Sequence, residues 1–323
     1  MPSYIRSLAV ALGLAATCLS GAARGKEPAA WTLQAGDDRV RVEVDGQLFT
    51  EYRFRGFAKP ILYPVLGPGQ TPMTRSYPIE ADRAGEAHDH PHHKSIWFAH
   101  GAVNGVDFWS EKGRIEHVRL VKVDEDASRP SITTDNRWLA PDGKLVATDT
   151  TTIAFLTLPG ARAIDLQVVV HASNGEVKFG DTKEGMMALR THPNLRLDND
   201  PKRGVTTANG KSVNSQGVQD GAMWGQRAAW VDYWGTIAGK PVGIAIFDHP
   251  QNLRHPTTWH ARSYGLVAAN PFGISYFEGK PKGSGDYTLA QGDEIAFRYR
   301  IVLHEGNAQQ AGVAKLYSAY AAE

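Results

Sequence analysis

Short runs of β-branched and aromatic residues, separated by turn residues, recur along most of this chain of 323 residues. Within residues 164–170 and 295–301 apolar and polar side chains alternate, as in strands that bury one face. Asn174-Gly175 is one of several dipeptides typical of tight hairpin turns. Helical periodicity is scarce before residues 313–321. The sequence therefore predicts an all-β fold, a large antiparallel β-sandwich with a short C-terminal helix.

The same criteria give the positions of the clearest strands. Each candidate is a β-branched or aromatic run bounded by Gly, Pro, Asn or Asp. We expect strands at residues 39–44, 48–54, 61–65, 115–123, 145–156, 163–171, 242–247 and 294–303.

The first 25 residues have the pattern of a secretory signal peptide. Arg6 supplies a positive charge, residues 8–19 are apolar, and small residues follow at Ala23 and Gly25. No later segment approaches the roughly 20 apolar residues that span a bilayer. We therefore expect a signal peptide at 1–25, a single β-sandwich catalytic or binding domain at 26–323, no membrane insertion after cleavage, and a periplasmic or secreted location.

The overall charge argues against nucleic acid as a partner. The 35 basic and 34 acidic side chains nearly cancel, and no basic stripe with interleaved aromatic residues is present. Cys18, the single cysteine, lies within the predicted signal peptide, so the mature chain would contain no disulfide.

The densest group of chemically active residues is a histidine cluster between His88 and His100, which contains five of the twelve histidines. Imidazole suits both proton transfer and metal ligation near neutral pH. His88, His90 and His92 could converge on a metal from one face of an extended segment. Alternatively, a turn at Pro91 aims His92 and His93 into a sugar-binding cavity, or the cluster is a hydrogen-bonded loop without chemistry. Trp97, just beyond the cluster, is a core residue or a platform for a sugar ring.

A second group lies at residues 183–192. Glu184, Arg190 and His192 fall on one face of an extended segment, which would place an acid, a cation and an imidazole together. A surface ion pair of little energetic value is the alternative interpretation.

The third group follows two apolar strands near residues 230 and 245. Asp232 lies in the first, and Asp248-His249 close the second, where catalytic side chains are often found. The loop beyond is unusually rich in Asn, Arg, His and Trp. Its candidate substrate-binding residues are Arg254, Trp259, His260, Arg262 and Asn270.

Residues 89–101, 103–109, 227–233, 247–250 and 264–273 together resemble the PmoA-like family, a group of secreted bacterial proteins of unknown function. The resemblance covers most of the mature chain. The family's label as a methane oxygenase does not suit a chain without a spanning segment after its signal peptide.

A weaker resemblance concerns the fold. Residues 60–67, the histidine cluster and residues 299–303 look like the galactose-mutarotase supersandwich. This resemblance implies a carbohydrate substrate and His, Glu or Asp acids and bases on a concave sheet. It assigns no individual residue, and a shared fold does not establish an activity.

Together these features predict a secreted carbohydrate-active enzyme, of the glycoside hydrolase or lyase type. It would cleave a glycoside or modified sugar by His/carboxylate acid–base catalysis. The predicted catalytic residues are His92, His93, His192, His249, Glu184, Asp232 and Asp248. The predicted substrate-binding residues are Arg190, Arg254, His260, Arg262, Asn270, Trp97 and Trp259.

Two alternatives stay open. One is a non-catalytic glycan-binding protein. The other is a metal-dependent sugar lyase or epimerase that binds a divalent metal through His88, His90 and His92 of the 88–93 cluster. The leading interpretation requires no cofactor.

Overall fold

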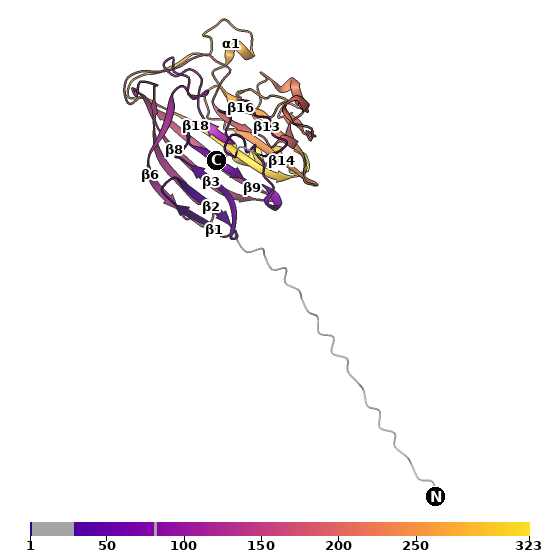
Figure 1. Ribbon diagram of the computed structural model, residues 1–323. Helices are drawn as coiled ribbons and strands as arrows, with labels where there is room; N and C mark the ends of the chain where they lie inside the picture. The colour runs from indigo at the N-terminus through magenta and orange to yellow at the C-terminus, as the bar shows by residue number, and fades with distance from the viewer. Residues whose placement is uncertain (2–28, 81–82) are drawn as a thin grey trace.

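The computed structural model describes Met1 and residues 29–80 and 83–323. Residues 2–25 of the predicted signal peptide lie outside the described residues. Two antiparallel eight-stranded sheets dominate the fold (Figure 1), which confirms the predicted β-sandwich class. No helix in the described ranges is long and apolar enough to cross a membrane.

The first sheet has the strand order β1-β2-β3-β4-β5-β11-β16-β15. Its strands, in that order, are β1 (Trp31–Ala35), β2 (Arg39–Val44), β3 (Gln47–Arg53), β4 (Ile61–Val65), β5 (Ile96–Phe98), β11 (Met187–Arg190), β16 (Leu266–Asn270) and β15 (Thr258–Trp259).

The second sheet has the order β12-β13-β14-β18-β9-β8-β7-β6. Its strands are β12 (Lys211–Asn214), β13 (Trp230–Ile237), β14 (Lys240–Asp248), β18 (Glu294–Glu305), β9 (Ala161–His171), β8 (Leu145–Leu158), β7 (Ser131–Leu139) and β6 (Arg114–Asp124). A separate two-stranded ribbon pairs β10 (Val177–Phe179) with β17 (Tyr287–Leu289).

The helices are short. They are α1 (Ile274–Phe277), which lies at one end of the molecule in Figure 1, and α2 (Val313–Tyr320), the predicted closing helix. Single 3₁₀ turns occur at η1 (Pro68–Gln70), η2 (Pro193–Leu195), η3 (Pro201–Arg203) and η4 (Asp220–Met223).

All eight strands expected from the sequence are present, with ends that shift by one or two residues. Among them β2 shows the alternating burial of a strand with one buried face: Val40, Val42 and Val44 are fully buried and their neighbours are not. In contrast, β11 and β16 are buried on both faces and show no alternation. The sequence did not predict these two strands, which are only four and five residues long, although they support the candidate site.

The outer face of the second sheet is covered by α2, which packs on Ala245, Phe247 and Val302. On the same face a buried pair joins β13 to β18, with His304 Nε2 2.9 Å from the carboxylate of Asp232. The carboxylate raises the pKa of His304 even though burial acts to lower it. Gly243 on the intervening strand leaves room for this imidazole, because a Cβ there would lie 2.2 Å from His304 Cε1.

We predict that Gly243→Ala lowers the free energy of unfolding by about 1–3 kcal/mol, the usual cost of overpacking a close-packed region. Chemical denaturation measures this change. Gly221→Ala is the matched control, because a Cβ at Gly221 would meet nothing within 4 Å. Equal stability of the two variants would contradict this account of the β13–β14–β18 region.

Candidate functional site

A cavity of about 520 Å³ gathers histidines from distant parts of the chain. This volume is within the range of small-molecule sites. Its lining residues combine imidazoles, acids, cations and aromatic rings. They are His90, His92, His93, Asp107, Trp109, Ser110, Lys183, Glu184, His260, Arg262 and Tyr264.

The cavity lies on the face of the first sheet that points away from the second. Phe98 of β5 packs on Trp138 and Phe297 of the second sheet. Because successive side chains of a strand point to opposite faces, Trp97 points away from that interface. The Trp97 ring instead contacts His93 and Trp109, which both line the cavity.

Four stacked rings form one side of the cavity. Tyr264 stacks on His90 with ring centres 5.3 Å apart, and His90 stacks on His93 at 4.7 Å. His93 in turn stacks on Trp97 at 5.3 Å. The two faces of the His93 ring are therefore covered by aromatic neighbours, and only its edges are free to make polar contacts.

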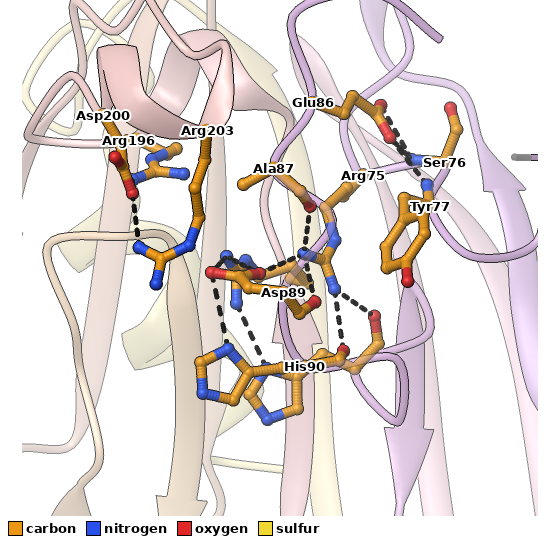
Figure 2. A network of polar contacts seen from close by, with 12 residues as sticks. Arg75, Ser76, Tyr77, Glu86, Ala87, Asp89, His90, Arg196, Asp200 and Arg203 are labelled. Carbon is orange, nitrogen blue, oxygen red and sulfur yellow. Dashed lines mark hydrogen bonds and ion pairs between the residues drawn. The ribbon is translucent and has the colours of Figure 1, made fainter. Parts of the chain in front are cut away.

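The carboxylate of Asp89 joins two buried arginines, Arg190 and Arg75, and Figure 2 shows its contact with Arg75. Arg75 also donates to the carbonyl oxygens of Ala87, His90 and His93. Arg190 donates to Asp89 Oδ1 at 2.8 Å. Burial opposes ionisation of Asp89, but a hydrogen bond from His90 and the charges of Arg190 and Arg75 outweigh it, so the pKa of Asp89 lies below its ordinary value.

This network fixes the tautomer of His93. An Arg190 guanidinium nitrogen lies 3.1 Å from His93 Nδ1. Because a guanidinium can only donate hydrogen bonds, Nδ1 accepts and the proton of the neutral ring is on Nε2. Burial, reinforced by the charge of Arg190, lowers the pKa of His93 well below 6.5. His93 is therefore a neutral N–H donor at neutral pH.

His260 has the opposite tautomer. Its Nδ1 lies 3.0 Å from the carbonyl oxygen of Lys183, which can only accept. Nδ1 therefore carries the proton and Nε2 keeps a lone pair. Burial lowers the pKa of His260 to about 4, so this imidazole is also neutral at pH 7. His260 can accept a proton, as a general base must.

The acids of the cavity are already engaged. Glu184 Oε1 lies 2.6 Å from Lys183 Nζ, and Glu184 Oε2 lies 4.0 Å from His260 Nδ1. Asp107 accepts from the backbone N–H of Ser110 at 2.9 Å and bonds the Ser110 hydroxyl.

The structure brings several of the predicted site residues together. His92, His93, Glu184, His260 and Arg262 all line the cavity. Two further predicted residues lie directly behind the wall. Trp97 stacks on His93, and Arg190 donates to it.

The structure places the two predicted aspartates elsewhere. Asp232 pairs with His304 under the outer face of the second sheet. Asp248 is fully buried and accepts from Asn252, His255 and the backbone of Thr257. In the fold both carboxylates satisfy buried donors away from the cavity.

Two predicted histidines also lie away from the cavity. His192 caps η2 by accepting from the backbone N–H of Asn194 at 3.2 Å. His249 lines a different cavity, on the outer face of the second sheet, and accepts from the backbone of Gln251.

Three predicted substrate-binding residues hold loops together instead. Arg254 donates to the carbonyl oxygens of Pro271 and Gly285, and Asn270 donates to that of Thr182. Trp259 is fully buried and donates to the carbonyl oxygen of Ala228.

The predicted metal ligands are not gathered into one group. His88 stacks on Tyr77 at 4.4 Å, whereas His90 stacks between Tyr264 and His93. The described part of the chain contains no group of three or more His, Cys, Asp or Glu side chains placed to hold a metal ion.

Sequence reasoning did not select several residues of the site. Trp109 and Tyr264 line the cavity, and both belong to motifs that the sequence had singled out without a role for these rings. Asp89 lies within the histidine cluster, between His88 and His90, which is a usable signal. Arg75 lies in an irregular segment 14 residues before Asp89, and no local pattern marks it.

We predict that the protein loses stability as the pH falls from about 6.5 to about 4. Burial lowers the pKa of His92, His100, His192 and His260 from 6.5 to about 4. Between these pH values the unfolded chain binds protons that the folded chain excludes. The free energy of unfolding therefore decreases as the pH decreases. Denaturation curves of wild type and His260→Gln should show a shallower pH dependence in the variant. The same pH dependence of the free energy of unfolding in both proteins would contradict the neutral, buried state of His260.

Several solved structures are similar to this chain at low identity. An alpha-galactosidase from Lactobacillus brevis is 9% identical at a TM-score of 0.33, over 88% of this chain and 40% of its own. A galactose mutarotase-like protein from Lactobacillus casei ATCC 334 is 9% identical at a TM-score of 0.33, over 85% of this chain and 100% of its own. A polysaccharide lyase is 10% identical at a TM-score of 0.31, over 88% of this chain and 33% of its own. This chain thus spans about 40% of the alpha-galactosidase. At these values the similarities identify no activity for it.

No protein with a curated description matches the chain. A family model does match, and its description is a family of unknown function (DUF6807). The match runs from residue 39 to residue 318 and includes every residue that lines the cavity. The chain therefore belongs to the DUF6807 family.

Proposed function

We propose that this protein is a carbohydrate-active enzyme that cleaves a glycoside or modified sugar by acid–base catalysis in the histidine cavity. The observation that carries the proposal is the pair of imidazoles with opposite tautomers. His93 offers an N–H donor and His260 a lone pair on the wall of one cavity. Trp109 and Tyr264 supply aromatic surface for the apolar face of a sugar ring.

Elimination fits these residues better than hydrolysis. Glycoside hydrolysis commonly uses two carboxyl groups, one of them protonated. Here Glu184 is paired with Lys183, and Asp107 is bonded to Ser110. Both imidazoles are neutral, which suits removal of a proton from carbon beside an oxygen that gains negative charge.

In the proposed reaction His260 Nε2 takes a proton from a sugar carbon. The C–H electron pair forms a carbon–carbon double bond as the bond to the leaving oxygen breaks. The imidazolium of His260 returns the proton to that oxygen, so the cycle requires no external acid. His93 Nε2–H donates to the substrate oxygen on which charge accumulates.

The proposal includes the setting of the enzyme. We propose that residues 1–25 act as a signal peptide and that residues 26–323 work as one domain in the periplasm or outside the cell. The resemblance to the secreted PmoA-like proteins supports this setting. A carbohydrate is the proposed partner, without nucleic acid and without membrane insertion after cleavage.

We predict that His260→Gln lowers turnover by about 10²–10⁴-fold, the usual contribution of a general base. The enzyme is incubated with a panel of neutral glycosides and uronic-acid glycans. Turnover is measured in two ways, by the ultraviolet absorbance of the unsaturated product and by the amount of new reducing ends. His171→Gln is the control, because His171 is a partly exposed histidine of β9 in the other sheet. It should retain wild-type turnover.

New reducing ends without an unsaturated product would show that the reaction is hydrolysis and not elimination. Unchanged turnover in His260→Gln would remove His260 from the mechanism. Sugar binding without any turnover would favour the glycan-binding alternative.

A further inference from the structure

Two buried N–H groups on the cavity wall have no hydrogen-bond partner among the described residues. They are His93 Nε2 and Trp109 Nε1. Each of the two side chains is only 1% exposed. Buried donors are nearly always satisfied in folded proteins, so two unpaired donors on one wall require an explanation.

His93 Nε2 is the polar atom of this ring that has no partner among the described residues. The two faces of the ring are covered by His90 and Trp97, and its Nδ1 accepts from Arg190. His93 lines the cavity, and Nε2 is the ring nitrogen that is left without a partner among the described residues. The Trp109 ring meets His93 edge to face, with ring centres 5.6 Å apart, so the two donors belong to adjoining rings.

Behind these rings lie four cations with three carboxylates, one of which is the buried Glu86 close to Arg75. Arg75 and Arg190, both buried, share the carboxylate of Asp89. Lys59 and Lys94 likewise share the carboxylate of Glu111, at 2.7 and 2.6 Å.

The Lys59 ammonium is part of the same wall. Its Nζ donates to the carbonyl oxygen of Trp109 at 3.3 Å and lies 5.8 Å from the centre of the Trp97 ring. Burial lowers the pKa of Lys59 to about 8, which still leaves it mostly protonated at pH 7.

The cavity rim adds another cation. Arg262 stacks over Tyr264 at 5.5 Å, and it has no carboxylate within 4 Å in the described part of the chain. Of the cavity acids, Glu184 is paired with Lys183, whereas Asp107 is bonded only to the neutral Ser110 and offsets one of the cations.

We infer that His93 and Trp109 bind a carboxylate of the substrate, so that the substrate is an acidic sugar of the uronate class. Two adjoining N–H donors match the two oxygens of a carboxylate, and hydrogen bonds to an ionised acceptor are the strong ones. This inference rests on the proposed function, which it deepens. Offsetting the carboxylate charge would also acidify the neighbouring C–H, the bond from which His260 is proposed to take its proton.

In this arrangement Arg190 is a positioning residue. It touches no substrate and acts through His93, whose Nδ1 it occupies. If Arg190 did not donate there, the His93 proton could move to Nδ1 and the donor facing the cavity would be lost.

The test compares binding of D-galacturonate and D-galactose, which differ at C6, by isothermal titration calorimetry. We expect wild type to bind galacturonate more tightly than galactose. Trp109→Phe and His93→Phe keep an aromatic ring but remove the N–H group. Each should weaken galacturonate binding about tenfold or more, as expected for a lost hydrogen bond to a charged group. Galactose binding should weaken by a smaller factor than galacturonate binding.

Trp224→Phe is the matched control. The Trp224 indole N–H is also buried without a partner among the described residues, but this side chain is not on the cavity wall. The Trp224→Phe variant should bind galacturonate with wild-type affinity. An NMR titration gives a readout that does not depend on stability, since the indole resonance absent from Trp109→Phe should shift with galacturonate and not with galactose.

Three outcomes would each overturn the inference. The first is equal binding of the two sugars, and the second is no binding of galacturonate. The third is wild-type affinity of Trp109→Phe together with an indole resonance that galacturonate does not shift. Turnover of a neutral glycoside that depends on His260 would leave the proposed function in place while removing the uronate assignment. Galacturonate binding through Trp109 without turnover of any glycan would keep the uronate assignment and remove the proposed catalysis.

Discussion

The carboxylate of Asp89, held between the buried guanidinium groups of Arg75 and Arg190, is the interaction on which the candidate site depends. Loss of this carboxylate would leave two buried cations without their counter-ion, which is strongly destabilising in a protein interior. Arg75 also binds the backbone carbonyl oxygens of His90 and His93, so it ties the histidine segment to the sheet. Arg190 completes the chain of contacts by donating to His93 Nδ1.

The two central imidazoles differ because their supporting groups differ. A guanidinium supports His93 and makes its outer nitrogen a donor, whereas a backbone carbonyl oxygen supports His260 and leaves its outer nitrogen an acceptor. Burial keeps both rings neutral, so neither needs to change protonation state to be ready at pH 7. One cavity can thus contain a base and a hydrogen-bond donor built from the same type of side chain.

The sequence predicted the fold class and long strands well because alternating burial leaves a period of two in the chain. It missed β11 and β16, which are buried on both faces and only four and five residues long, and also β7, along which burial does alternate. The density of histidines singled out a segment of which His90, His92 and His93 line the candidate cavity. Asp232 was misplaced because its partner, His304, is 72 residues away, and no local pattern reports such a pairing. Trp109 and Tyr264 were passed over because an aromatic residue in a motif looks the same in a core and on a cavity wall.

The most direct test of this account is a long-range ¹H–¹⁵N NMR spectrum of histidine-labelled protein at pH 7, assigned with His93→Phe and His260→Gln. The account predicts two neutral rings with opposite tautomers, protonated at Nε2 in His93 and at Nδ1 in His260. The same tautomer in both rings, or an imidazolium in either, would contradict the division of roles on which the proposed chemistry depends.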